Sequence, residues 1–229
     1  MKYEIVDNFL ALEDLAYLQS LLETLEPKSD SQTSFRNVRN SIPNKNTISN
    51  EKFKQLEEAY LPRAVEILRR LAPHKLDLVD DVVFNLQATP PNFSFPVHLD
   101  DRKKVLSGVI YLKPNLCTGT ILHKGLDDDS GEEIPWVVNR AFFFSRTPTD
   151  SWHSYKGDGV GYRWVLIFNL ITYQERTHEI RDLGIVGFVR SGITNSFLQR
   201  KHLIGELGIS RYLGSAIINI FLHRKKKSK

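Results

Sequence analysis

The chain has 229 residues, of which 41% are hydrophobic and 25% charged, and this composition suits one globular domain with a sizeable core. A single cysteine, Cys117, excludes an intrachain disulfide framework and fits a reducing compartment, so we interpret it as a small buried hydrophobic residue. The last six residues, Arg224 to Lys229, carry five positive charges, so the rest of the chain has a net charge of −1 against +4 for the whole. That body lacks the basic surface of a protein whose affinity for nucleic acid depends on phosphate contacts.

The N-terminal stretch, MKYEIVDNFL, lacks the apolar core of a signal peptide because Glu4 and Asp7 interrupt it. We expect a strand here and a cytoplasmic protein. The leucines between Leu12 and Leu25 then recur at helical spacing until Pro27, which predicts an amphipathic helix with its leucines turned inward.

The stretch from Lys28 to Asn50 is rich in Ser, Asn and Thr and holds few apolar residues, which predicts a long loop. Long loops in compact domains are often functional. We interpret this one as a lid, with Phe35, Arg36 and Arg39 closing over an acidic or amide-bearing substrate.

A second helix is predicted from about Glu51 to Leu71, and Pro62 should kink or divide it. From Leu78 to Tyr173 the pattern changes to about eight short apolar runs separated by turns, which indicates a small β-barrel or a double-sheet jelly roll. The polar connection 124–133, KGLDDDSGEE, is interpreted as a solvated hairpin loop, with a calcium site as the minor alternative because the EF-hand spacing is absent. Two helices beside such strands predict an α+β fold that is mainly β.

Beyond Tyr173 the pattern is weaker, and it predicts an edge strand or loop followed by a helical segment interrupted by glycines. The apolar run from Tyr212 to Leu222 has eleven residues, well short of the roughly 20 that span a bilayer. Packing on the barrel with a solvated basic tail is the favoured interpretation of this terminus. Peripheral contact of the tail with an anionic membrane surface is the alternative.

Three side chains in the strand-like half suit a divalent metal ion. His98 and Asp100 are two residues apart and therefore share a face of an extended segment. His153, beside another predicted strand, can supply the third ligand. Two histidines and a carboxylate form the facial triad of non-heme Fe(II) oxygenases. His123 lacks a carboxylate partner in its strand and is interpreted as structural.

Arg163 follows His153 by ten residues, past a glycine-rich turn, and opens an otherwise apolar strand. A guanidinium in such a strand needs an anion, and a carboxylate is its natural bidentate partner. A dicarboxylic cosubstrate that chelates the metal at one end could reach Arg163 with the other.

Several motifs, in their order along the chain, resemble the Fe(II)- and 2-oxoglutarate-dependent dioxygenases, and most of all their prolyl-4-hydroxylase-like branch. They are YEIVDNFL near the N-terminus, HLD at 98–100, LSGVIYLKP at 106–114, TGT at 118–120, NRAFFF at 139–144, and the order His153, Gly161, Arg163. The similarity covers roughly residues 1–173. That branch often has lysine where Arg163 stands.

The resemblance implies a double-stranded β-helix, or jelly-roll, core with N-terminal flanking helices and a C-terminal helical extension. It implies a dioxygenase domain over 1–173, made of a helical flank at 1–77 and a β-helix core at 78–173, followed by an extension with a basic tail at 174–229. The implied cofactors are Fe(II), 2-oxoglutarate as cosubstrate, and ascorbate. The implied site residues are His98, Asp100 and His153 for catalysis and metal binding, and Arg163, Tyr111 and Thr120 for cosubstrate binding.

The implied reaction is the hydroxylation of a C–H bond in a prolyl, peptidyl or small-molecule substrate, with O2 consumed and succinate and CO2 formed. Asp100 completes the triad, and this argues against the related halogenases, which have a small residue there. Two other hypotheses remain: a catalytically silent, cupin-like barrel that binds metal or ligand, and a nucleic-acid demethylase with the same triad. Succinate formation distinguishes a hydroxylase from the silent barrel. A steep salt dependence of nucleic-acid binding would favour the demethylase.

Overall fold

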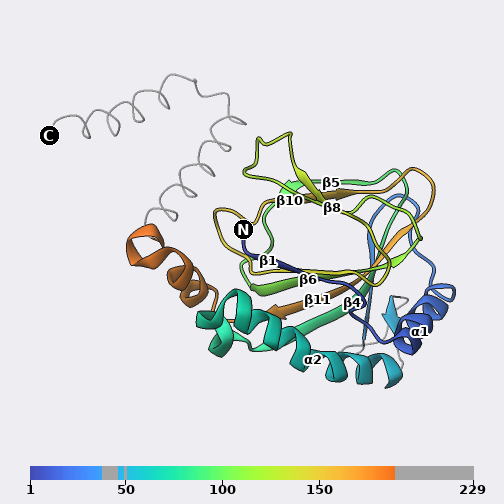
Figure 1. Cartoon of the computed structure of the whole chain (residues 1–229), viewed down its shortest axis with the longest axis horizontal. Helices are drawn as coiled ribbons and strands as arrows, with labels where there is room; N and C mark the ends of the chain where they lie inside the picture. The colour runs from blue at the N-terminus through green and yellow to red at the C-terminus, as the bar shows by residue number, and fades with distance from the viewer. Residues whose placement is uncertain (38–45, 49–50, 189–229) are drawn as a thin grey trace, which may run out of the picture. The chain divides into compact units, whose positions relative to one another are not determined.

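The computed structural model describes residues 1–37, 46–48 and 51–188 (Figure 1). The contacts divide the chain into two units, Met1–Asp182 and Leu183–Lys229. The first unit contains all the strands and helices that surround the candidate site.

Strands dominate the first unit, with two full helices, a 3₁₀ helix and the beginning of a third helix among them (Figure 1). In chain order the elements are β1 (Tyr3–Val6), α1 (Leu12–Leu22), β2 (Thr33–Asn37), β3 (Thr47–Ile48), α2 (Glu51–Leu71), η1 (Pro73–Leu78), β4 (Asp81–Thr89), β5 (Ser94–His98), β6 (Lys104–Lys113), β7 (Thr120–Leu122), β8 (Glu132–Ile134), β9 (Ala141–Phe144), β10 (His153–Lys156) and β11 (Arg163–Ile171). Residues 175–188 are helical.

The strands form two facing sheets, as predicted for a jelly roll. The larger sheet has the order β1-β9-β6-β11-β4-β2-β3, and the smaller has the order β5-β10-β7-β8. The strands pair antiparallel in both sheets, apart from the parallel pair β2 and β3. β4 to β11 are the eight strands expected between Leu78 and Tyr173. β7 and β8 pair as the hairpin expected around the polar 124–133 connection.

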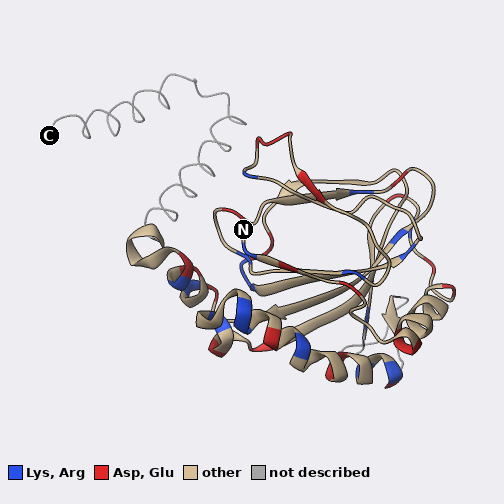
Figure 2. Ribbon diagram, viewed as in Figure 1, with Lys and Arg blue, Asp and Glu red and all other residues tan. Residues whose placement is uncertain are grey.

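α2 packs on the outer face of the larger sheet through aromatic contacts (Figure 1). The Phe53 ring lies 5.0 Å from that of Phe84 on β4, which in turn lies 5.1 Å from Phe168 on β11. Many charged residues of α2 lie on its solvent side (Figure 2). Pro62 does not divide this helix, which is continuous because its buried apolar face holds both halves against the sheet.

The prediction of a loop over 28–50 was wrong in part, because the segment contributes β2 and β3 to the edge of the larger sheet. β2 contains mostly polar residues, so a search for alternating apolar residues assigns it to a loop. Phe35 is buried and stacks on Trp164 at 5.8 Å, so it belongs to the core rather than to a lid. Arg39 lies outside the described residues. In α1, Leu18 and Leu22 face inward as expected, whereas Leu12 is exposed.

The segment after β11 is helical over 175–188 instead of an edge strand or loop. His178 and Glu179 of this helix are buried. A search for apolar periodicity does not detect a helix whose buried side chains are polar. In the described part of the chain, no helix has the length and apolar character to cross a bilayer. Tyr212–Leu222 and the basic tail lie outside the described residues, so membrane contact remains a prediction.

Candidate metal centre and its cavity

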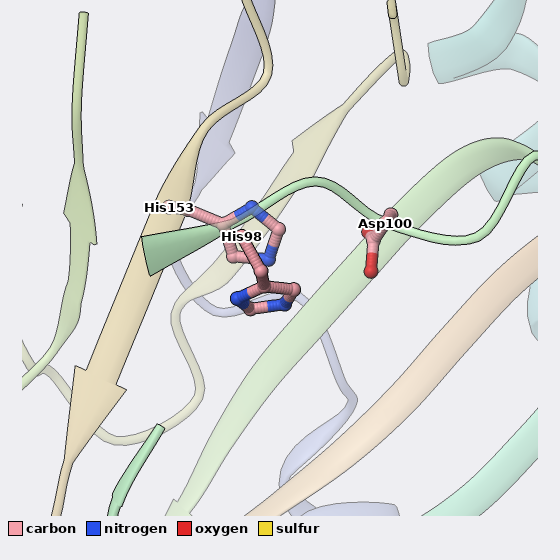
Figure 3. Close-up of side chains that lie close together, drawn as sticks. All are labelled: His98, Asp100 and His153. Carbon is pink, nitrogen blue, oxygen red and sulfur yellow. The ribbon is translucent and has the colours of Figure 1, made fainter. Parts of the chain in front are cut away.

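His98, Asp100 and His153 lie together, as the sequence predicts, although they come from different strands and a loop (Figure 3). One ligand atom from each residue lies within 4.8 Å of the others. His98 ends β5 and pairs in register with His153, which begins β10. Asp100 follows on the loop after β5. The antiparallel pairing of β5 and β10 therefore brings residues 55 positions apart in sequence to one point.

Backbone carbonyls orient both imidazole rings. Nδ1 of His98 donates to the carbonyl of Pro96 at 2.9 Å, and Nδ1 of His153 donates to that of Ser151 at 3.0 Å. A carbonyl can only accept, so each Nδ1 carries the proton and each Nε2 keeps its lone pair for a metal. Burial lowers the pKa of His98, and it lowers that of His153 to about 4. Both rings are thus neutral, as metal ligands must be.

Asp100 is buried and stays ionised through two neighbours on β6. Burial alone would raise its pKa, but the ammonium of Lys104, the nearby His153 and hydrogen bonds from Lys104 and Ser107 lower it to about 2. Lys104 Nζ lies 2.5 Å from Oδ1, and the hydroxyl of Ser107 donates to Oδ2. These contacts fix the carboxylate as an anionic ligand, a role that neighbouring hydrogen bonds commonly support.

The triad opens into a cavity of about 550 Å³ between the two sheets. Arg163 also lines this cavity, together with Tyr155 and several polar residues of β2, β4 and β11. A volume of this size falls in the usual range for small-molecule sites.

Arg163 is 1% exposed, and its guanidinium lacks a carboxylate partner among the described residues. Its Nε donates to the carbonyl of Thr118 at 3.3 Å, while its Nη2 is buried without a hydrogen-bond partner in the part of the chain that the structure describes. The rings of Tyr155, Trp136 and Tyr111 surround the guanidinium at 4.9, 5.2 and 5.6 Å. Burial lowers the pKa of Arg163, although a guanidinium remains charged at neutral pH. A buried cation in this state needs an anionic ligand.

Tyr111 and Thr120 are close to each other rather than to the cavity. The Tyr111 hydroxyl donates to Thr120 Oγ1 at 3.1 Å and accepts from the Thr120 amide at 3.0 Å. The Tyr111 ring stacks on Trp136 at 4.3 Å and contacts Arg163. Their direct binding of a cosubstrate stays a prediction, and the observed contact is with the arginine.

Sequence reasoning missed Tyr155, which lines the cavity and accepts a hydrogen bond from the side-chain amide of Gln32. Its ring stacks on Phe95 at 5.1 Å. Tyr155 lies two residues after His153 on β10, so the strand alternation that linked His98 to Asp100 could have found it. His123, by contrast, is satisfied by Asp128 and Ser154, as expected for a structural histidine.

The residues present fit a divalent metal and a dicarboxylate. Two neutral imidazoles and one carboxylate form the donor set of a non-heme Fe(II) site. The unpaired Nη2 of Arg163 in the same cavity fits the distal carboxylate of a ligand that also reaches the metal.

The sequence matches no protein-family model and is not significantly similar to a curated protein. Solved structures do match the fold of the chain, which is the double-stranded β-helix of the 2-oxoglutarate- and Fe(II)-dependent oxygenases.

Two of these structures are prolyl hydroxylases. A prolyl-4-hydroxylase from Pseudomonas putida is 16% identical, with a TM-score of 0.53, and the match covers 74% of this chain and 92% of that one. A prolyl hydroxylase from Trichoplax adhaerens, in complex with a hypoxia inducible factor peptide fragment, is 15% identical, with a TM-score of 0.53 over 76% of this chain and 86% of that one.

HygX from Streptomyces hygroscopicus, with nickel, 2-oxoglutarate and hygromycin B bound, is 7% identical. Its TM-score is 0.53, and the match covers 75% of this chain and 83% of that one. At these identities the likeness shows the fold, and the resemblance drawn from the sequence motifs is confirmed at that level.

Proposed function

We propose that the protein is a non-heme Fe(II)- and 2-oxoglutarate-dependent dioxygenase that hydroxylates a C–H bond of a prolyl, peptidyl or small-molecule substrate. The observation that carries this proposal is the placement of a buried, unpaired arginine in the same cavity as a His-Asp-His triad. A metal-binding barrel of another kind would need the triad alone. The fold shared with prolyl hydroxylases and with HygX supports the same assignment.

In this proposal Nε2 of His98, Nε2 of His153 and one Asp100 oxygen hold Fe(II). Lys104 and Ser107 keep the Asp100 carboxylate ionised and oriented. Arg163 binds the distal carboxylate of 2-oxoglutarate, and the aromatic rings around it exclude water.

When bound, iron and 2-oxoglutarate supply the chemistry: O2 is consumed, the cosubstrate is decarboxylated to succinate, and the substrate gains a hydroxyl group. The protein would hold the reactants together in one cavity, which lowers the entropic cost of bringing them into contact. Ascorbate, as a reductant that restores Fe(II), remains part of the proposal.

The test is succinate formation by purified protein supplied with Fe(II), 2-oxoglutarate and O2, together with elemental analysis of bound iron. We expect iron-dependent succinate formation in the wild type, and loss of both iron and succinate in His98→Ala, Asp100→Ala and His153→Ala. His74→Ala is the matched control, because His74 is a half-exposed histidine outside the cavity. It should keep both.

The outcomes separate the rival hypotheses. Iron bound by the triad without 2-oxoglutarate binding or succinate formation would identify a catalytically silent, cupin-like barrel. Unchanged iron occupancy in the triad variants would remove the metal site itself. A screen of peptides and metabolites for stimulated 2-oxoglutarate turnover then narrows the substrate.

A further inference from the structure

One wall of the cavity is polar, and the proposed roles of iron and 2-oxoglutarate do not use it. We call the polar wall the four lining residues Ser34 and Arg36 of β2 and Asn85 and Gln87 of β4. Each pair has the two-residue spacing that puts side chains on one face of a strand. The residues of β4 that alternate with them, Phe84 and Leu86, belong to the hydrophobic core instead.

Strand register fixes how these residues neighbour one another. β2 and β4 pair antiparallel with Arg36 opposite Asn85 and Ser34 opposite Gln87. Side chains directly opposite on one face have their Cβ atoms about 4.5–5.5 Å apart. The polar wall therefore offers a guanidinium beside an amide, and a hydroxyl beside a second amide.

Asn85 is the anomaly in this wall. It is 4% exposed, and its Oδ1 is buried without a hydrogen-bond partner in the described part of the chain. Another asparagine of the same cavity, Asn169, is equally buried, but its Oδ1 accepts from the Gly108 amide at 3.2 Å. A buried polar atom without a partner costs free energy, so it is expected where a ligand completes the hydrogen bond.

Arg36 gives the wall its charge. It is exposed, lines the cavity and makes no ion pair with a described residue. Arg163 differs, because it is fully buried among aromatic rings at another place in the same cavity. The two cations thus offer separate sites for two anionic groups, one deep and one near the solvent.

We propose that the polar wall recognises the substrate, and that this substrate is a small carboxylic acid with a hydroxyl or amide group a few bonds from its carboxylate. This inference rests on the proposed function. Arg36 binds the carboxylate, and Asn85 pairs with the hydroxyl or amide, since an amide side chain can both donate and accept. The cavity volume of about 550 Å³ favours a small molecule beside the cosubstrate over a large one.

The probes are L-asparagine, L-glutamine and L-threonine, each paired with its α-carboxamide, in which the carboxylate is neutralised. Binding is measured by calorimetry on the protein with and without a divalent metal, and turnover by succinate formation. We expect at least one of the acids to bind and to stimulate turnover, and its α-carboxamide to bind at least tenfold more weakly. Arg36→Gln should remove that preference for the acid.

Asn85→Leu should raise the KM for the stimulating acid at least tenfold. Its second readout, stability to urea, does not depend on turnover: the protein should become no less stable, because the variant removes a buried amide with an unpaired oxygen. Asn169→Leu is the matched control for stability. It should destabilise the protein, because it deprives the Gly108 amide of its acceptor.

Each other outcome overturns a definite claim. Succinate formation that no acid stimulates, with no calorimetric binding, overturns the substrate class and leaves the oxygenase proposal standing. Absence of 2-oxoglutarate turnover together with absence of 2-oxoglutarate binding overturns the proposed function instead. An Asn85→Leu variant that weakens 2-oxoglutarate rather than the acid would assign the wall to the cosubstrate.

Discussion

Two buried polar regions of this molecule differ in how their charges are satisfied. In the cavity, Arg163 and Asn85 each have a buried atom without a hydrogen-bond partner in the described part of the chain. A second group contacts the loop after β5 that carries Asp100, which we call the metal loop. We call this group the closed cluster, and its members are Lys75, Arg146, His178, Glu179 and Asp182. Arg146 Nη1 and His178 Nε2 also lack a hydrogen-bond partner among the described residues, but each lies within 4 Å of a carboxylate, as does Lys75 Nζ.

The closed cluster ties the C-terminal part of the first unit to the metal loop. Lys75 Nζ lies 2.8 Å from an oxygen of Asp182, and Arg146 Nη1 lies 3.7 Å from Glu179. Arg146 Nε also donates to the backbone carbonyl of Asp100 at 3.3 Å. Paired buried charges support structure, whereas unpaired ones in a cavity indicate a ligand. The predictions below test this distinction.

The largest effect is expected in the closed cluster. Asp182→Ala leaves the Lys75 ammonium buried without its carboxylate, and breaking a buried pair in this way costs about 3–5 kcal/mol. Urea denaturation measures the loss in free energy of unfolding.

Asp77→Ala is the control for this experiment, since Asp77 pairs with Arg181 at the exposed surface. An exposed pair contributes about 0–1 kcal/mol. Equal losses in the two variants would show that burial of the cluster does not decide its contribution.

Arg163→Met should give the opposite result, with stability kept and ligand binding lost. The variant removes an unpaired buried cation, so the free energy of unfolding should not fall. Affinity for 2-oxoglutarate should fall at least tenfold, because a hydrogen bond to a charged group contributes about 1.5–3 kcal/mol. Anaerobic titration of the metal-to-ligand charge-transfer band measures this. A titration like that of the wild type would remove Arg163 from the cosubstrate site.

The triad residues and Arg163 could be singled out because each stands in or beside a recognisable strand, whereas their meeting at one point depends on the pairing of β5 with β10. His98 and Asp100 are two residues apart, and Arg163 is an arginine at the start of an apolar strand. The eight core strands carry a similar signal in their short apolar runs. The polar wall could not be found this way, since it needs the register that places Arg36 opposite Asn85.

β2 and the closed cluster escaped prediction for a related reason. β2 is a partly polar strand next to the edge strand β3, and its pairing with β4 comes from tertiary contacts rather than from propensity. Asp182 and Lys75 are more than a hundred positions apart, so their pairing depends on the whole fold.

The pH dependence of the free energy of unfolding gives a second test of the closed cluster, through His178. Burial, with Lys75 beside it, lowers the pKa of His178 from 6.5 to about 4. The unfolded chain therefore binds this proton more tightly, and stability should fall as the pH drops from about 6.5 towards 4. His178→Gln should weaken this fall, as shown by metal-free urea titrations at pH 7 and pH 5. An unchanged pH dependence would assign it to other groups.

The smallest effect is expected for Tyr111→Phe, which tests the predicted cosubstrate role of that hydroxyl. The Tyr111 hydroxyl already donates to the Thr120 hydroxyl and accepts from the Thr120 amide. The ring, which contacts Arg163, is kept in the variant. A neutral hydrogen bond contributes about 0.5–1.5 kcal/mol, so affinity for 2-oxoglutarate should fall by no more than about tenfold, less than in Arg163→Met. Thr120→Val, in the same titration, removes the other hydroxyl of the pair. If both variants bind 2-oxoglutarate like the wild type, the pair supports the position of Arg163 through packing alone and does not contact the cosubstrate.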